Sequence, residues 1–142
     1  MERMIRNILL LIACVCACAC AKDGEDEPEI ALFDVSGVWQ ETAYLCSDGY
    51  FVPVYGLGAM NYEFAIPNIY SQYTLDESGN KDVYKQGEWE YNPETKCVHV
   101  TEPRGWNLDI YFTFGEKNNA TLDIRGRTTT SNSTVKVKRL TK

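Results

Sequence analysis

The chain of 142 residues contains one histidine, His99, and this scarcity limits the catalytic chemistry available to it. A Ser/His/Asp set would have to use that residue, and the sequence has no nucleophile elbow to accompany it. No glycine-rich loop follows a strand and opens a helix, which is the arrangement that binds phosphates. His99 has no second convincing ligand nearby, so we expect no metal site. We therefore predict a protein that is not an enzyme and has no cofactor.

Basic residues and long apolar runs are also in short supply. The chain has 14 Lys and Arg against 20 Asp and Glu, which gives a net charge of −6. Nucleic-acid binding favours the opposite balance, so we expect no nucleic-acid partner. The apolar run from Ile8 to Ala21 has about 14 residues, fewer than the roughly 20 that a membrane-spanning helix needs.

The apolar run is better explained as part of an N-terminal signal peptide. Arg3 and Arg6 precede it and small residues end it, which is the pattern of a secretory signal. Four cysteines at alternate positions do not suit a core helix: Cys14, Cys16, Cys18 and Cys20. They resemble the motif of bacterial lipoproteins, in which the signal peptide is removed and the next cysteine becomes the acylated N-terminus. We expect residues 1–19 to be that signal peptide.

The cysteines compete for the acylation site. Leu11-Ile12-Ala13-Cys14 looks most like the usual motif but leaves a very short apolar region. Cys20 gives a signal peptide of ordinary length, and the following Lys22-Asp23-Gly24-Glu25-Asp26-Glu27 resembles the tether of many Gram-negative lipoproteins. We therefore favour Cys20, with Cys14 and Cys18 as alternatives. A secreted protein without a lipid is the simplest alternative of all.

Residues 20–32 are expected to form a lipidated cysteine and an acidic tether. The segment holds five acidic residues and Pro28. Such a segment cannot bury apolar area and stays extended. The resemblance to lipoproteins implies a membrane anchor through N-terminal acyl chains, two or more of which hold a protein stably. It places the protein in the cell envelope, at the outer membrane, facing either the periplasm or the cell surface.

From Phe33 onward, apolar residues recur at every second position, which is the period of a strand with one buried face. Turn sequences such as Asp76-Glu77-Ser78-Gly79-Asn80 separate these stretches. We predict eight strands, near residues 37–45, 60–66, 69–75, 82–91, 97–101, 108–114, 120–125 and 134–140. The stretch from Gly49 to Ala59 is a long aromatic connection with room for one more, irregular strand.

Short strands joined by tight turns pair with their sequence neighbours. A meander of eight such strands usually closes into a barrel, because closure removes the two exposed edges. We therefore predict an all-β domain over residues 33–142, folded as a small antiparallel up-and-down β-barrel. A β-sandwich is the alternative.

The opening of this domain, Val35-Ser36-Gly37-Val38-Trp39, resembles the Gly-x-Trp motif of the lipocalin superfamily. More closely it resembles the small lipocalin-like domains that follow lipoprotein signals. Gly87 to Tyr91, which precede an Asn-Pro turn, and the closing Thr134 to Leu140 also fit these domains. The likeness covers most of residues 33–142. The C-terminal helix of full lipocalins is not expected here, which weakens the transfer of any particular ligand.

The resemblance also implies how the barrel closes. In lipocalin-like barrels the Trp of the opening motif lies at the closed end, and a basic side chain of the last strand covers it. The matching residues here are Trp39 and Arg139. A guanidinium over an indole gains about 0.5–1 kcal/mol when exposed. The alternative is a register shifted by one residue, with Lys138 or Val137 at the Trp and Arg139 in solvent.

Cys46 and Cys97 are the two cysteines of the domain. An exported compartment permits a disulfide between them. The bond would close a loop of about 50 residues and stabilise the fold by roughly 4 kcal/mol. Two unpaired thiols, buried like small apolar residues, are the alternative.

Aromatic residues exceed what a small core needs, and they raise two hypotheses of function. In the first, the barrel holds a small apolar or glycan-like ligand. The candidate lining residues are Tyr62, Phe64, Trp89, Tyr91 and Phe112. In the second, side chains fill the barrel, and only its outer face or loops meet a protein partner that the sequence does not identify. A continuous cavity above about 300 Å³ favours the first hypothesis, and a packed interior favours the second.

Overall fold

The computed structural model describes residues 35–127 and 132–140, which form one antiparallel sheet. Its nine strands are β1 (Gly37–Leu45), β2 (Phe51–Pro53), β3 (Asn61–Ala65), β4 (Ile69–Leu75), β5 (Lys81–Asn92), β6 (Cys97–Thr101), β7 (Asn107–Phe114), β8 (Asn119–Gly126) and β9 (Asn132–Arg139). A 3₁₀ turn, η1 (Gly56–Gly58), lies between β2 and β3. The predicted signal peptide, the acylation candidates Cys14, Cys18 and Cys20, and the acidic tether lie outside the described residues.

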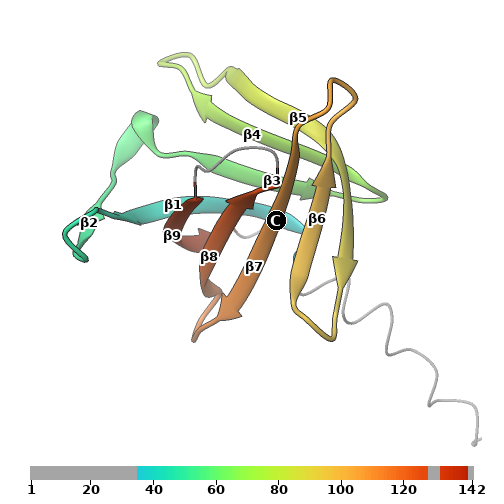
Figure 1. The fold of residues 1–142 in the computed structure, drawn as a ribbon. Coiled ribbons are helices and arrows are strands. Elements are labelled where there is room, and N and C mark those ends of the chain that lie inside the picture. Colours follow the sequence, from blue (N-terminus) through green and yellow to red (C-terminus); the bar gives the residue numbers. More distant parts are fainter. Residues whose placement is uncertain (1–34, 128–131, 141–142) are drawn as a thin grey trace, which may run out of the picture. The chain divides into compact units, whose positions relative to one another are not determined.

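Eight of the nine strands close into a barrel. Each strand from β3 to β9 pairs with its sequence neighbour, and β1 pairs with both β3 and β9, which completes the ring. Figure 1 shows β1, in cyan, beside β9, in dark red. The extra strand β2 is short and pairs with the end of β1. The predicted up-and-down barrel is therefore confirmed, and the sandwich alternative is wrong.

All eight predicted strands are present, and their ends agree with the prediction to within two residues. The aromatic connection from Gly49 to Ala59 supplies the additional β2 and η1. The end of this connection is tied to the sheet by Asn61, whose side-chain amide donates to the backbone oxygens of Ala59 (3.4 Å) and Tyr73 (3.3 Å).

Alternation along each strand turns one set of side chains into the barrel. The buried residues form one contiguous core: Val35, Trp39, Tyr62, Phe64, Tyr70, Trp89, Val98, Val100, Leu108, Ile110, Phe112, Ala120, Leu122, Ile124, Val135 and Val137. Aromatic rings meet at its centre, where the Phe112 ring centroid lies 5.5 Å from those of Trp39 and Phe64. Each large side chain buried in this way stabilises the fold by about 1.5–3 kcal/mol. The interior core therefore holds the barrel together.

One end of the barrel is splayed, because two neighbouring strands differ in length. β5 has 12 residues and β6 has 5, and their pairing runs from Glu88–Thr101 to Asn92–Cys97. The first half of β5 pairs with β4, and the β6–β7 turn lies on its other side. Where the two strands part, a Cβ on Gly87 would lie 2.6 Å from the Thr101 carbonyl oxygen. Glycine is therefore needed for this close approach.

Candidate functional site

The residues predicted to line a ligand pocket lie in the barrel core. Tyr62, Phe64, Trp89 and Phe112 are buried, and Tyr91 packs against them. The Phe64 ring centroid lies 5.9 Å from that of Trp89 and 5.5 Å from that of Phe112. These rings contact one another, so they fill the middle of the barrel rather than surround a ligand.

A groove of about 770 Å³ lies instead at the splayed end, between β5 and the β6–β7 turn. Its apolar lining consists of Ile69, Val83, Tyr84, Pro103 and Trp106. Tyr84 is 58% exposed and Val83 is 47% exposed, which is unusual for large apolar side chains on a strand. Figure 1 shows the β6–β7 turn projecting beside β5. The groove is thus a consequence of the unequal lengths of β5 and β6.

Charged groups of both signs border this groove. The Lys85 ammonium lies 5.3 Å from the centroid of the Trp106 ring. On the opposite wall, Glu102 accepts a hydrogen bond from the backbone N–H of Arg104 (3.0 Å), and the Arg104 side chain extends into solvent. Glu88 also lines the groove. The groove therefore offers aromatic rings next to hydrogen-bond donors and acceptors.

The structure brings together Trp39 and Arg139. The two residues are direct partners in the register of β1 and β9, and the guanidinium carbon lies 4.5 Å from the centroid of the indole ring. The indole N–H donates to the carbonyl of Val35 (2.8 Å). The stacked pair therefore lies at the seam where the first and last strands meet.

The structure does not bring together Cys46 and Cys97: both thiols are free, which is the second of the two alternatives that the sequence left open. In the ring of eight strands, β1 and β6 lie four positions apart in either direction. Cys46 follows the end of β1, and Cys97 opens β6. A disulfide needs Cα atoms within about 7 Å, and strands on opposite sides of a barrel are farther apart.

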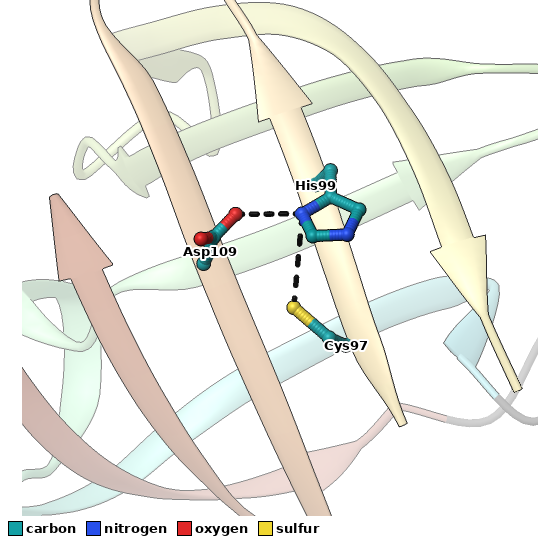
Figure 2. A group of neighbouring side chains, drawn as sticks. All are labelled: Cys97, His99 and Asp109. Atoms are coloured by element: carbon teal, nitrogen blue, oxygen red, sulfur yellow. Dashed lines mark hydrogen bonds and ion pairs between the residues drawn. The ribbon is translucent and has the colours of Figure 1, made fainter. Parts of the chain in front are cut away.

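A polar cluster lies on the outer wall of the barrel, on β6 and β7 (Figure 2). Cys97 and His99 are two residues apart on the outward face of β6, and Asp109 is the direct partner of His99 on β7. Nδ1 of His99 lies 2.6 Å from Oδ1 of Asp109 and 3.9 Å from Sγ of Cys97. The expectation that His99 has no ligand-type neighbour is therefore wrong. Asp109 is ten positions away, and the strand register brings it there.

Arg127, just after β8, reaches the same cluster. Its Nη2 lies 2.6 Å from Oδ1 of Asp109 and 2.5 Å from Nδ1 of His99, and its Nε donates to the same Oδ1 at 2.8 Å. The guanidinium holds the pKa of Asp109 below its ordinary value. Burial, and then the negative charge of Asp109, raises the pKa of the Cys97 thiol. A carboxylate, an imidazole, a thiol and a guanidinium thus lie within reach of one another.

One further polar residue, Glu41, faces the barrel interior and was not expected there. It lies two positions after Trp39 on β1, and its Oε2 accepts a hydrogen bond from the backbone N–H of Met60 (3.3 Å). Desolvation raises the pKa of this half-buried carboxyl above 4.5, although the Met60 hydrogen bond acts in the opposite direction. Burial, and then the charge of Glu41, raises the pKa of the Tyr62 phenol. The sequence does contain a signal for this buried carboxyl: Glu41 stands two positions after Trp39, so strand alternation points both side chains into the barrel.

Compared with known protein families and with curated proteins, the chain matches none. Among the residues that the structure describes, no helix has both the length and the apolar character to cross a membrane. The closed eight-stranded barrel is compatible with the lipocalin-like fold that the Gly37-x-Trp39 opening resembles. The fold and its sites thus define a small antiparallel barrel with a packed centre, a groove at its mouth and a polar cluster on its wall.

Proposed function

We propose that the protein is a lipid-anchored binding protein of the cell envelope, and that it holds a glycan-like ligand in the groove at the mouth of its barrel. The observation that carries this proposal is the groove of about 770 Å³ beside Tyr84 and Trp106. Small-molecule sites typically measure about 300–1,000 Å³. Since side chains pack the centre of the barrel, we place the ligand in the groove. The role is one of binding rather than catalysis.

The chemistry of the groove favours a sugar over a purely apolar ligand. Apolar ligands are held in pockets that cover most of their surface, whereas this groove is open and carries Lys85, Glu88 and Arg104 at its border. A sugar ring presents a face of C–H groups to an aromatic side chain and hydroxyl groups at its rim. Tyr84 and Trp106 can stack on the C–H face of the sugar, and the neighbouring charged side chains can form hydrogen bonds with its hydroxyl groups.

An array of soluble oligosaccharides, probed with the full chain in detergent, tests this proposal. We expect binding to one class of oligosaccharide. Tyr84→Ala should weaken it by about tenfold, because truncating an aromatic anchor typically costs more than about 1 kcal/mol. Tyr84 is exposed, so its removal leaves the core intact. Tyr55→Ala, at an 83% exposed tyrosine that does not line the groove, is the matched control and should bind normally.

Two other results would assign a different function. Binding of palmitate without any oligosaccharide would identify an apolar ligand. Binding of neither would favour the second hypothesis, in which the outside of a solid barrel meets a protein. That hypothesis has one observation in its favour: within the described residues, β5 has no strand partner on its β6 side before Glu88. Such an open edge can accept an extended peptide.

The lipid anchor is proposed from the N-terminal sequence and needs its own test. Cys20→Ala should leave the protein unprocessed and free of lipid, as measured by intact mass and by membrane fractionation. If the variant still carries lipid, the acylated residue is Cys14 or Cys18, and the same substitution at each identifies it. A wild-type protein that is processed but carries no lipid would favour the secreted alternative.

A further inference from the structure

The outer-wall cluster contains three kinds of donor atom that bind metal ions. Sγ of Cys97, Nδ1 of His99 and a carboxylate oxygen of Asp109 all lie within 4.8 Å of one another. Figure 2 shows Nδ1 of His99 turned toward both of the other side chains. The spacing of two residues on β6 and the register of β6 with β7 hold the three donors on one face of a closed sheet.

The two distances from His99 to the other donors need only small changes to enclose an ion. With Zn–N and Zn–O bonds of about 2.1 Å and Zn–S of about 2.3 Å, a tetrahedral site places nitrogen and oxygen roughly 3.4 Å apart, and nitrogen and sulfur roughly 3.6 Å apart. The corresponding distances are 2.6 Å and 3.9 Å. Both therefore change by less than about 1 Å, which side-chain rotation can supply.

The contacts of Arg127 and Asp109 with His99 require opposite protonation states of the same atom, Nδ1. Nη2 of Arg127 is a donor, so its contact with Nδ1 requires that Nδ1 carry no proton. The carboxylate of Asp109 is an acceptor, so its contact with Nδ1 requires a proton there. A metal ion between these groups takes the lone pair of Nδ1 and an oxygen of Asp109 at the same time. Arg127 already places positive charge at that position.

We propose that Cys97, His99 and Asp109 bind a zinc ion on the outer wall of the barrel, and that the ion displaces Arg127. A mixed set of sulfur, nitrogen and oxygen donors suits Zn²⁺. The side chains of His99 and Asp109 are 39% and 19% exposed, so the ion has access from solvent, and a water can occupy the fourth position. The zinc site is separate from the groove and does not depend on the proposed ligand.

The test uses the full chain in detergent, with Cys14, Cys16, Cys18 and Cys20 changed to serine. The barrel thiols Cys46 and Cys97 then remain as the thiol donors. Zinc affinity is measured by competition with a chromophoric chelator. Cobalt serves as the spectroscopic probe, because tetrahedral Co²⁺ absorbs strongly in the visible and a bound thiolate adds a charge-transfer band in the near ultraviolet. We expect one ion per chain and both spectral features.

Substitutions at the ligands should separate this site from adventitious binding. Cys97→Ser and His99→Gln should each weaken zinc binding by more than about tenfold, since even changes to groups behind the ligands cost 10–100-fold. Cys46→Ser is the matched control and should leave affinity and spectrum unchanged.

Arg127 gives a second and opposite prediction. Arg127→Met should tighten zinc binding by roughly two- to fivefold, the range expected when a half-exposed ion pair no longer competes. Lys138→Met is the control, because it also removes one positive charge from the outside of the barrel, at an exposed residue of β9 whose strand partners are Gln40 and Asn119 and not the proposed ligands. A purely structural role for Arg127 would give no such gain.

Two outcomes would overturn the proposal. One is zinc affinity that Cys97→Ser and His99→Gln leave unchanged, and the other is a cobalt spectrum without a thiolate band. If circular dichroism shows that Cys97→Ser does not fold, His99→Gln alone decides, because His99 is partly exposed and its change spares the core. Zinc binding that Arg127→Met weakens would refute the displacement of Arg127.

Discussion

The inner and outer faces of β6, β7 and β8 are specified in different ways. Every inward side chain on these strands is apolar, and alternation within the strand is enough to bury it. The outer cluster is assembled from three segments of the chain. β6 supplies Cys97 and His99, β7 supplies Asp109, and Arg127 directly follows β8. The inner face is therefore encoded within each strand, whereas the outer cluster depends on the register between strands.

The two faces also differ in what they contribute to stability. Buried apolar side chains contribute about 1.5–3 kcal/mol each. Half-exposed ion pairs contribute about 0–1 kcal/mol. Substitutions inside the barrel should therefore have large effects on folding, and substitutions outside it should have small ones. The outer wall can consequently carry a binding site at little cost to the fold.

The largest loss of stability is expected at Phe112 on β7. Its neighbour Thr113 faces the opposite side of the strand and provides the comparison. Phe112→Ala removes a ring that contacts Trp39 and Phe64. It should lower the free energy of unfolding by about 3–5 kcal/mol. Thr113→Ala, on the exposed face, should change it by less than about 0.5 kcal/mol. Urea unfolding of both variants measures the difference, and equal effects would contradict the assignment of the two faces.

A smaller effect is expected where β5 and β6 part. Gly87→Ala brings a Cβ to 2.6 Å from the backbone oxygen of Thr101, so a strand has to shift. We expect a loss of about 1–3 kcal/mol, as for other overpacked sites. Gly58→Ala is the control, since a Cβ there meets nothing within 4 Å. Thermal unfolding compares the two, and a neutral Gly87→Ala would show that the strands are not held in close contact.

The fold could be predicted from the sequence because its determinants are local. Strands with an alternating pattern and short turns between them pair in order, and closure follows from the need to remove the edges. Trp39 and Arg139 lie far apart in the chain, yet they meet because a closed meander makes the first and last strands neighbours. Closure predicts that the two strands are neighbours, whereas the choice of Arg139 as the partner of Trp39 came from the resemblance to lipocalin-like barrels.

The candidate sites could be predicted only in part. The sequence left the pairing of Cys46 and Cys97 open, because the length of the loop between them says nothing of the barrel diameter that separates them. The partnership of His99 with Asp109 was missed because it depends on the β6–β7 register. The groove was missed because it results from a mismatch in length between β5 and β6, which becomes visible only when the two strands are paired.

A substitution at the seam between β1 and β9 should lower the free energy of unfolding by less than a substitution in the core. Arg139→Lys keeps the positive charge but loses the flat guanidinium that lies 4.5 Å from the Trp39 ring centroid. We expect a loss of about 0.5–1 kcal/mol in the free energy of unfolding. Lys138→Arg, at the exposed neighbouring position, is the control and should stay within about 0.5 kcal/mol of the wild type. Equal stability of Arg139→Lys and the wild type would show that charge alone is sufficient at the seam.

Glu41 is an acidic residue on the otherwise largely apolar inner face, and its substitution should give the smallest change in stability, one that depends on pH. Desolvation raises the pKa of this carboxyl above 4.5 in the folded protein. The folded state therefore binds the proton more tightly than the unfolded state does. The stability that this group contributes is present at low pH and is lost as the pH rises through the raised pKa. At neutral pH the charged carboxylate thus opposes folding.

Glu41→Gln removes the charge and keeps an oxygen to accept the Met60 N–H. At pH 7 the variant should be more stable than the wild type, by less than about 1 kcal/mol, because the half-buried carboxylate keeps part of its hydration. The gain should vanish near pH 4, where the wild-type carboxyl is protonated as well. Urea midpoints at the two pH values measure this, and Glu116→Gln, in an exposed turn, controls for the loss of one negative charge. A variant less stable than the wild type at pH 7 would mean that the charge is a stabilising feature of the inner face.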